Sequence, residues 1–349
     1  MSLGLLEALE DTRAFEATHR FEHLSEFHVP FDELTRSETT ESTLRALAAR
    51  RGKVALVGPS GAGKSSVIAS VLGPMAEELA EEVIPLRIPV AALDIETATE
   101  PMAFAQHLLR TVIRYSTEIL TAEESVALSR SAADQVSSEG AGRTHRFSIG
   151  APKLLLDLGF ASEVKSEAEQ FVEQGGGPAL EGATRLVELF HAHGREPFLI
   201  IDDSDHWIRV AGKDLTATAD GFFLHVVPFL TREIGCGFVL AIHDQYLELQ
   251  SYREAGVLLS RTIRLPRPAE ARSAIIAILE RRMEVAELSA NWSDVLDPAA
   301  IYLLAELYEE NRSLRRMLAT VDRATQLGCT DRVETISAEL IQTALADLG

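Results

Sequence analysis

KVALVGPSGAGKSSVI, residues 53–68, joins an apolar run to a glycine-rich loop and the start of a helix. Residues 53–57 predict a short buried strand, and residues 66–72 carry apolar side chains at helical spacing. The loop between them fits the pattern G-x-x-x-x-G-K-[ST], in which backbone N–H groups and a lysine surround a phosphate. The stretch therefore predicts a phosphate-binding loop between a strand and a helix. The alternative is a glycine-rich turn without a ligand.

Nine consecutive residues are expected to hold a nucleotide, namely Gly58, Pro59, Ser60, Gly61, Ala62, Gly63, Lys64, Ser65 and Ser66. The glycines let the backbone curl so that successive N–H groups point at an anion. Lys64 is expected to reach the terminal phosphates, and the Ser65 hydroxyl to bind Mg²⁺. The helix that begins near Lys64 directs its positive end at the same phosphates. We therefore expect a nucleoside triphosphate and Mg²⁺ as ligands.

A second apolar run, residues 197–201, ends in Asp202 and Asp203. A run of this kind predicts a buried parallel strand whose carboxyl end lies at the same sheet edge as the phosphate loop. Asp202 is expected to hold Mg²⁺ opposite Ser65. Asp203 is expected to polarise the attacking water. The alternative is a strand that ends in an acidic turn without a catalytic role.

Three further strands are expected from apolar runs at residues 83–90, 237–242 and 260–268. Pro85 and Pro89 favour an edge position for the first of them, because proline cannot donate to a central sheet ladder. The second ends in His243, which either hydrogen-bonds the γ-phosphate or the water, or belongs to a simple turn.

A helix is expected at 101–115. Residues 120–180 suggest a flexible insertion with a β-hairpin at 143–150 and 153–164, as a partner surface or a mere excursion.

The chain divides into three predicted parts: an N-terminal helical segment (1–50), a core (51–266) that carries the insertion at about 120–180, and a helical domain (267–349). Helices are expected at residues 270–288, 298–309, 313–328 and 336–348, after the last strand. An α/β block followed by helices favours two packed units. In the N-terminal segment, residues 28–31 either line an adenine pocket or place Phe31 in the core.

Composition narrows the classes of function. The chain has 349 residues, 46% of them hydrophobic, and carries a net charge of −20. That charge opposes a general attraction to nucleic acid, which needs a basic surface. No apolar run is long enough to cross a membrane and no secretion signal is present, so we expect a cytoplasmic protein that does not bind membranes. The two cysteines, Cys236 and Cys329, are expected to be core residues rather than a disulfide or metal pair.

The order of these features resembles the AAA+ ATPases, in particular the branch of origin-recognition and transposition-regulator ATPases and the related signal-transducing switch ATPases. The resemblance covers about residues 25–330. It implies a P-loop NTPase with a three-layer αβα core, a parallel five-stranded sheet and an all-helical lid. It also implies ATP and Mg²⁺ as ligands, a homo-oligomer, and a protein effector. In that family the second carboxylate is commonly Glu, whereas this sequence has Asp203, whose shorter side chain holds water less well.

Two arginines gain roles only from the resemblance. Arg315, within residues 311–318 (NRSLRRML), matches the family's second sensor motif, which implies contact between the lid and the nucleotide phosphates. Alternatively, Arg312, Arg315 and Arg316 form a solvated helix face or pair with Glu309 and Glu310. Arg261 resembles the position from which a neighbouring subunit inserts an arginine finger, where it would neutralise charge during phosphoryl transfer.

Three functions stay open on the sequence. The first is an ATPase switch that controls a partner, and the second is a nucleotide-dependent scaffold with slow or absent hydrolysis that recruits an effector or a DNA-processing partner. The third, a small-molecule kinase, needs an acceptor pocket and usually has no acidic strand end of this kind. The absence of an Asn-Lys-x-Asp motif argues against a GTPase, and the absence of a Ser-Gly-Gly signature argues against a transport ATPase.

Overall fold

The computed structural model describes residues 3–35, 39–78, 83–90, 93–133, 158–174, 177–202, 204 and 216–348. These residues form two compact units. The first combines Met1–Thr43, Val57–Val71 and Arg264–Gly349, and the second combines Leu44–Leu56 and Leu72–Ile263. The phosphate loop therefore groups with the N-terminal and C-terminal helices. In the described part of the chain no helix is both long and apolar enough to cross a membrane.

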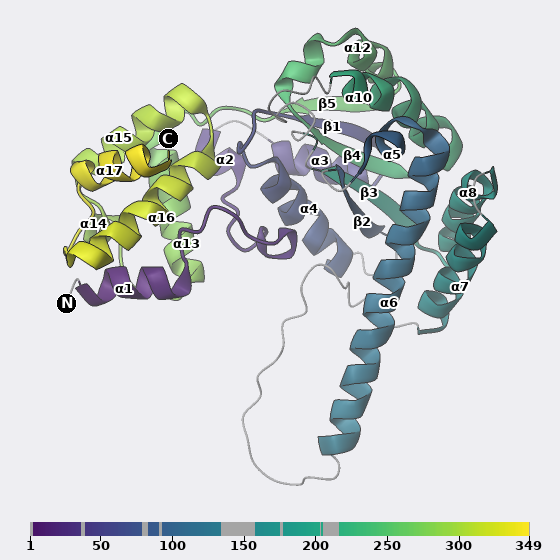
Figure 1. Ribbon diagram of the computed structural model, residues 1–349, viewed down its shortest axis with the longest axis horizontal. Helices are drawn as coiled ribbons and strands as arrows, with labels where there is room; N and C mark the ends of the chain where they lie inside the picture. Colours follow the sequence, from purple (N-terminus) through teal and green to yellow (C-terminus); the bar gives the residue numbers. More distant parts are fainter. Residues whose placement is uncertain are drawn as a thin grey trace. The chain divides into compact units, whose positions relative to one another are not determined.

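A parallel five-stranded sheet forms the centre of the second unit (Figure 1). Its strands are β1 (Lys53–Val57), β2 (Val83–Pro89), β3 (Glu196–Asp202), β4 (Gly237–Ile242) and β5 (Arg261–Arg264), in the order β2-β3-β4-β1-β5. Every residue of β3 and β4 is buried, because both strands have neighbours on each side. β2 lies at an edge, as its two prolines predict. In the β2–β3 register Pro89 pairs with Asp202.

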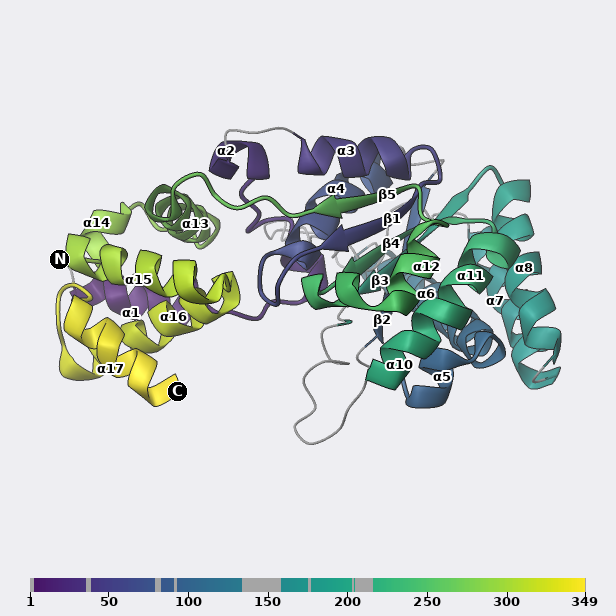
Figure 2. The ribbon, with the colours of Figure 1, turned by 90° about the horizontal axis from the view of Figure 1, so that it is seen from above.

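Helices flank this sheet (Figures 1 and 2). They are α5 (Ile95–Thr99), α6 (Pro101–Ala133), α7 (Leu158–Gln174), α8 (Gly177–Ala192), α10 (Thr216–Gly221), η4 (Phe222–Val226), α11 (Val227–Phe229), η5 (Leu230–Ile234), η6 (Asp244–Glu248) and α12 (Gln250–Gly256). α6, α7 and α8 pack against one another. The fold class predicted from the sequence, an αβα P-loop core followed by helices, is confirmed.

The prediction of a β-hairpin in the insertion is wrong for the part of that segment that the structure describes. Residues 158–164 form the first turns of helix α7, whereas residues 134–157 lie outside the described part of the chain. Ala161, Val164 and Ala168 are each at most 1% exposed and follow one another at spacings of three and four residues. That spacing gives one face of a helix, and the apparent alternation before Val164 was too short to decide between the two periods.

The first unit is mainly helical. It contains α1 (Leu3–Thr12), η1 (Phe21–His23), α2 (Phe31–Thr35), α13 (Ala271–Val285), α14 (Trp292–Val295), α15 (Pro298–Asn311), α16 (Leu314–Asp331) and α17 (Ala338–Leu348). α3 (Thr40–Ala48) and α4 (Lys64–Glu78) begin in this unit and end in the other. The four helices expected after residue 269 are present as α13, α15, α16 and α17.

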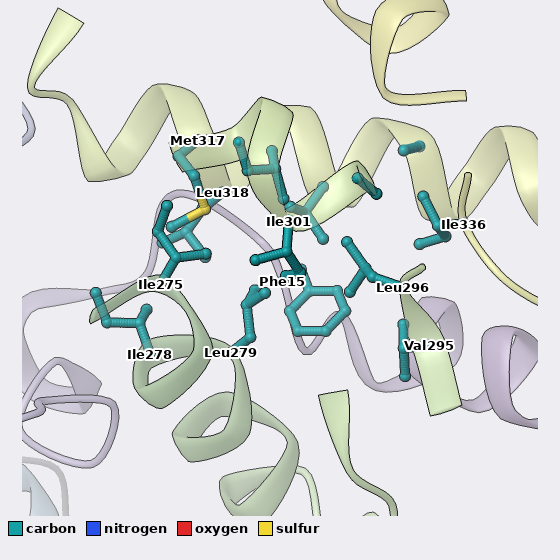
Figure 3. Packing of buried hydrophobic residues seen from close by; sticks show 14 of the residues in the cluster. Phe15, Ile275, Ile278, Leu279, Val295, Leu296, Ile301, Met317, Leu318 and Ile336 are labelled. Atoms are coloured by element: carbon teal, nitrogen blue, oxygen red, sulfur yellow. The ribbon is translucent and has the colours of Figure 1, made fainter. Parts of the chain in front are cut away.

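The N-terminal residues complete the core of this helical unit. Leu6, Leu9 and Phe15 belong to the same buried cluster as residues of α13 to α17, and Phe15 is 1% exposed. Figure 3 shows the Phe15 ring among Leu279, Leu296 and Ile301, and α1 packs against α16. The sequence did not predict which partner would bury the apolar face of α1.

Candidate nucleotide-binding site

The phosphate loop folds around its own lysine. Gly61 and Gly63 have φ angles of 76° and 96°, which lie in the region that favours glycine. Lys64 begins α4 and is 7% exposed, and its Nζ donates to the carbonyls of Gly58 and Pro59 at 2.8 Å and 3.0 Å. The loop therefore surrounds a buried ammonium group, as an anion-binding loop requires.

The start of α16 lies directly on this loop. α15 ends at Arg312, in the left-handed conformation with φ 52°. The next residue, Ser313, caps α16 by accepting a hydrogen bond from the Arg316 N–H, and the Leu314 N–H donates to the Gly61 carbonyl at 3.0 Å. A Cβ atom added at Gly61 would lie 2.4 Å from Ser313 Oγ and 3.0 Å from Arg315 Cβ. The sequence motif assigned to a lid sensor is thus in contact with the phosphate loop.

One form of the alternative interpretation, a solvated helix face, fits the exposed side chains of Arg315 and Arg316, whereas the other form, pairing with Glu309 and Glu310, gains no support. Within the residues that the structure describes, no ion pair joins Arg312, Arg315 or Arg316 to Glu309 or Glu310. Arg315 is exposed, and its backbone is fixed by the first turn of α16 beside Gly61. The geometry leaves the guanidinium within a side chain's length of the loop.

Substitution of Gly61 tests this contact. Gly61→Ala should destabilise the first unit by about 2–5 kcal/mol, because a left-handed φ costs a non-glycine residue about 1–2 kcal/mol and overpacking adds about 1–3. Gly63→Ala is a matched control: it carries the same backbone penalty, but its nearest side-chain atom, Leu314 Cδ1, is 3.9 Å away. Denaturant unfolding of both variants measures the difference, and equal losses would show that α16 does not lie on the loop.

At the acidic strand end, Asp202 is 1% exposed and closes β3. Arg87 of β2 places Nη2 3.7 Å from Asp202 Oδ2. Asp203 lies outside the described residues, but Ser204 after it is tightly held: its hydroxyl donates to the Ala241 carbonyl at 2.7 Å, and the Tyr246 hydroxyl donates to its carbonyl at 2.7 Å. Residues on both sides of Asp203 are therefore fixed to the sheet.

His243 and Arg261 occupy the strand ends that the sequence predicts. His243 follows β4 and caps η6, where its Nδ1 accepts from the Gln245 N–H at 3.2 Å and lies 2.9 Å from Asp244 Oδ1. Both of these contacts are made by Nδ1. Arg261 is the exposed first residue of the edge strand β5. An exposed edge position is compatible with contact to a second copy of the chain.

His28 connects the phosphate-loop helix to the N-terminal residues. Its Nδ1 lies 3.0 Å from Ser66 Oγ and its Nε2 lies 2.9 Å from Glu41 Oε1, which also accepts from the Phe31 N–H. Burial would raise the pKa of Glu41, but the hydrogen bonds from His28 and Phe31 hold it below its usual value. Phe31 is 5% exposed, which favours the core position over an adenine pocket for this side chain.

No family model and no curated protein matches this sequence. Several solved structures do match this chain. The ORC2 protein of Aeropyrum pernix, in ADPNP and ADP complexes, superimposes with a TM-score of 0.50 at 16% identity over 91% of this chain and 70% of that chain. This chain has the AAA+ fold.

Two further AAA+ structures are similar at lower scores. The ADP form of the same ORC2 protein has a TM-score of 0.49 at 15% identity, over 87% of this chain and 66% of that chain. Drosophila ORC bound to DNA has a TM-score of 0.46 at 14% identity, over 95% of this chain and 67% of that chain. The AAA+ resemblance seen in the sequence is confirmed at the level of fold by the ADPNP and ADP complexes of ORC2.

Two residues of this candidate site were missed in the sequence. Arg87 stands among apolar residues in the strand VIPLRIP, and a charged residue in such a strand indicates a buried counterion. That signal was available, although it did not identify Asp202 as the partner. Glu41 gave no signal, because an acidic residue in the first turn of a helix is ordinary.

Proposed function

We propose that this chain binds ATP with Mg²⁺ and hydrolyses it to drive a conformational or assembly switch that controls a partner protein. The observation that carries the proposal is the hydrogen bond from the Leu314 N–H of α16 to the Gly61 carbonyl. A γ-phosphate bound by the loop lies beside this contact, so its presence or loss changes the relative stability of two positions of α16. The helical domain thereby senses the nucleotide.

The proposal gives each predicted residue one task. Loop N–H groups and Lys64 bind the phosphates. Ser65 and Asp202 are the ligands for Mg²⁺, which prefers oxygen donors such as the buried Asp202 carboxylate and, when bound, neutralises phosphate charge. Asp203 orients the attacking water, and His243, which follows β4, hydrogen-bonds the γ-phosphate or the water.

Two arginines complete the proposed machinery. Arg315 contacts the phosphates from the helical domain, since its backbone lies against Gly61. Arg261 acts in a neighbouring copy, and its exposed place on an edge strand supports this. The proposal therefore includes a homo-oligomer and a cytoplasmic location. Nucleic acid is a possible partner that the net charge of −20 does not support.

Phosphate release by an Asp203 variant tests the hydrolysis step. Asp203→Asn should keep ATP affinity within about twofold but lower the turnover rate by about 10²–10⁴, the usual contribution of a general base. Asp347→Asn, at an exposed carboxylate in α17, is the matched control and should hydrolyse ATP at the wild-type rate. Equal turnover by wild type and Asp203→Asn would contradict the assignment.

A scaffold with little hydrolysis is the second candidate, and the Arg87–Asp202 ion pair favours it. Arg87 already balances the charge of the carboxylate that is proposed to hold Mg²⁺. A scaffold would assemble or recruit its effector when ATP binds, without turnover. Light scattering with a non-hydrolysable ATP analogue, combined with phosphate release, separates the two: nucleotide-dependent assembly together with background phosphate release supports the scaffold.

A further inference from the structure

The strap, defined as residues 24–31, lies against the first turn of α4. His28 is its central contact, with a side chain only 7% exposed. Its ring reaches two polar neighbours at once: Nε2 lies 2.9 Å from Glu41 Oε1, and Nδ1 lies 3.0 Å from Ser66 Oγ. Because the Glu41 carboxylate can only accept, Nε2–H donates to it.

The Ser66 hydroxyl is committed to the strap. It lies 3.0 Å from His28 Nδ1 and 3.4 Å from the Leu24 carbonyl. Ser66 follows Lys64 by two residues, within the helical turn whose backbone N–H groups face a phosphate in loops of this type. A contact that fixes Ser66 therefore also fixes the orientation of those N–H groups.

The strap itself is firmly held by α13. Arg281 Nε donates to the Glu26 carbonyl at 2.8 Å. Arg282, 5% exposed, donates to the Glu16 carbonyl at 2.7 Å and lies 4.9 Å above the Phe27 ring. These contacts hold the strap to α13 at Glu26 and Phe27, directly before His28, so that the contacts of His28 link α13 to the first turn of α4.

We propose that His28 is a positioning residue for the phosphate loop, holding the first turn of α4 through Ser66 in the geometry that binds a triphosphate. This inference rests on the proposed function. If it is correct, His28 affects the affinity for the triphosphate group itself, irrespective of the attached base. Tripolyphosphate with Mg²⁺ is therefore a probe that contains the relevant group and nothing else.

Affinity for ATP and for tripolyphosphate is measured by calorimetry in four variants. His28→Leu should weaken both ligands by about tenfold, since a lost hydrogen bond is worth about 0.5–1.5 kcal/mol and 1.4 kcal/mol corresponds to tenfold. His28→Asn, whose amide falls near the position of Nδ1, should restore both affinities to within about twofold. The longer amide of His28→Gln reaches toward Glu41 instead of Ser66, so this variant should not restore the affinities. His23→Ala, at an exposed histidine of the same segment, is the control.

A double-mutant cycle with Ser66→Ala shows whether the two residues act through one contact. If they do, His28→Leu combined with Ser66→Ala binds no more weakly than either single variant. Additive losses would instead show that Ser66 binds phosphate independently of His28, and would overturn the inference. Thermal unfolding checks that each variant is folded. If His28→Leu does not fold, the comparison of His28→Asn with His28→Gln tests the positioning role instead.

Two results distinguish this inference from the proposed function. If the wild-type chain binds neither ATP nor tripolyphosphate, the proposed function itself fails. If the wild type binds both but His28→Leu binds tripolyphosphate as tightly as the wild type does, ATP binding is intact as a function and the positioning role is wrong.

Discussion

Lys64→Ala should raise the dissociation constant for ATP by at least about 100-fold, a loss of about 2.7 kcal/mol. Lys64 is 7% exposed, and its Nζ lies inside the loop, bonded to Gly58 and Pro59 carbonyls. At such a site a charge-assisted hydrogen bond to phosphate contributes about 1.5–3 kcal/mol, and the low local dielectric strengthens the Coulomb attraction further. Titration with ATP and Mg²⁺ in a calorimeter measures the constant directly.

A second readout checks that the Lys64 variant remains folded. ATP at 100 times its dissociation constant should stabilise the wild type by about 2.7 kcal/mol, and the same concentration should leave the variant almost unchanged. Lys165→Ala is the matched control, because Lys165 pairs with Glu169 along α7, and it should bind ATP like the wild type. Undiminished affinity in Lys64→Ala would contradict nucleotide binding by this loop.

The sequence predicted those parts of the fold that a single local sequence pattern determines. β4 begins and ends where its apolar run does, at Gly237 and Ile242, because a strand buried on both faces is continuously apolar. Pro85 and Pro89 placed β2 at the edge for a reason that holds in any sheet. The loop at residues 58–66 was recognisable because glycine and lysine positions are fixed by the phosphate they surround.

Other parts depend on contacts between distant residues, which no local pattern encodes. The apolar face of α1 required burial, but nothing in residues 3–12 specified α16 as its partner. Helix α6 continues to Ala133, well beyond the expected end at residue 115, since its pattern weakens without a proline or glycine to stop it. In the candidate site, the ion pair between Arg87 and Asp202 joins residues 115 positions apart, and it became visible only through the β2–β3 register.

Phe15→Ala should destabilise the helical unit by about 3–5 kcal/mol, the usual cost of emptying a buried phenylalanine site. Phe15 is 1% exposed and belongs to the cluster that α1 forms with α13 to α17. Because a domain is commonly stable by only about 5–15 kcal/mol, this loss removes a large share of the total. A residue of the N-terminal segment would thus control the stability of a domain that begins about 250 positions later in the chain.

The measurement has to report on this unit alone, since a chain with two units need not unfold in one step. Trp292 of α14 packs against the same cluster, and the chain has one other tryptophan, Trp207. In a Trp207→Phe background, urea unfolding followed by fluorescence therefore monitors the helical unit. Leu348→Ala, at a side chain 47% exposed, is the control and should change stability by less than about 0.5 kcal/mol. If Phe15→Ala also changes the stability of the helical unit by less than about 0.5 kcal/mol, α1 and the residues after it do not belong to this core. The strap would then lack the support that the positioning role of His28 requires.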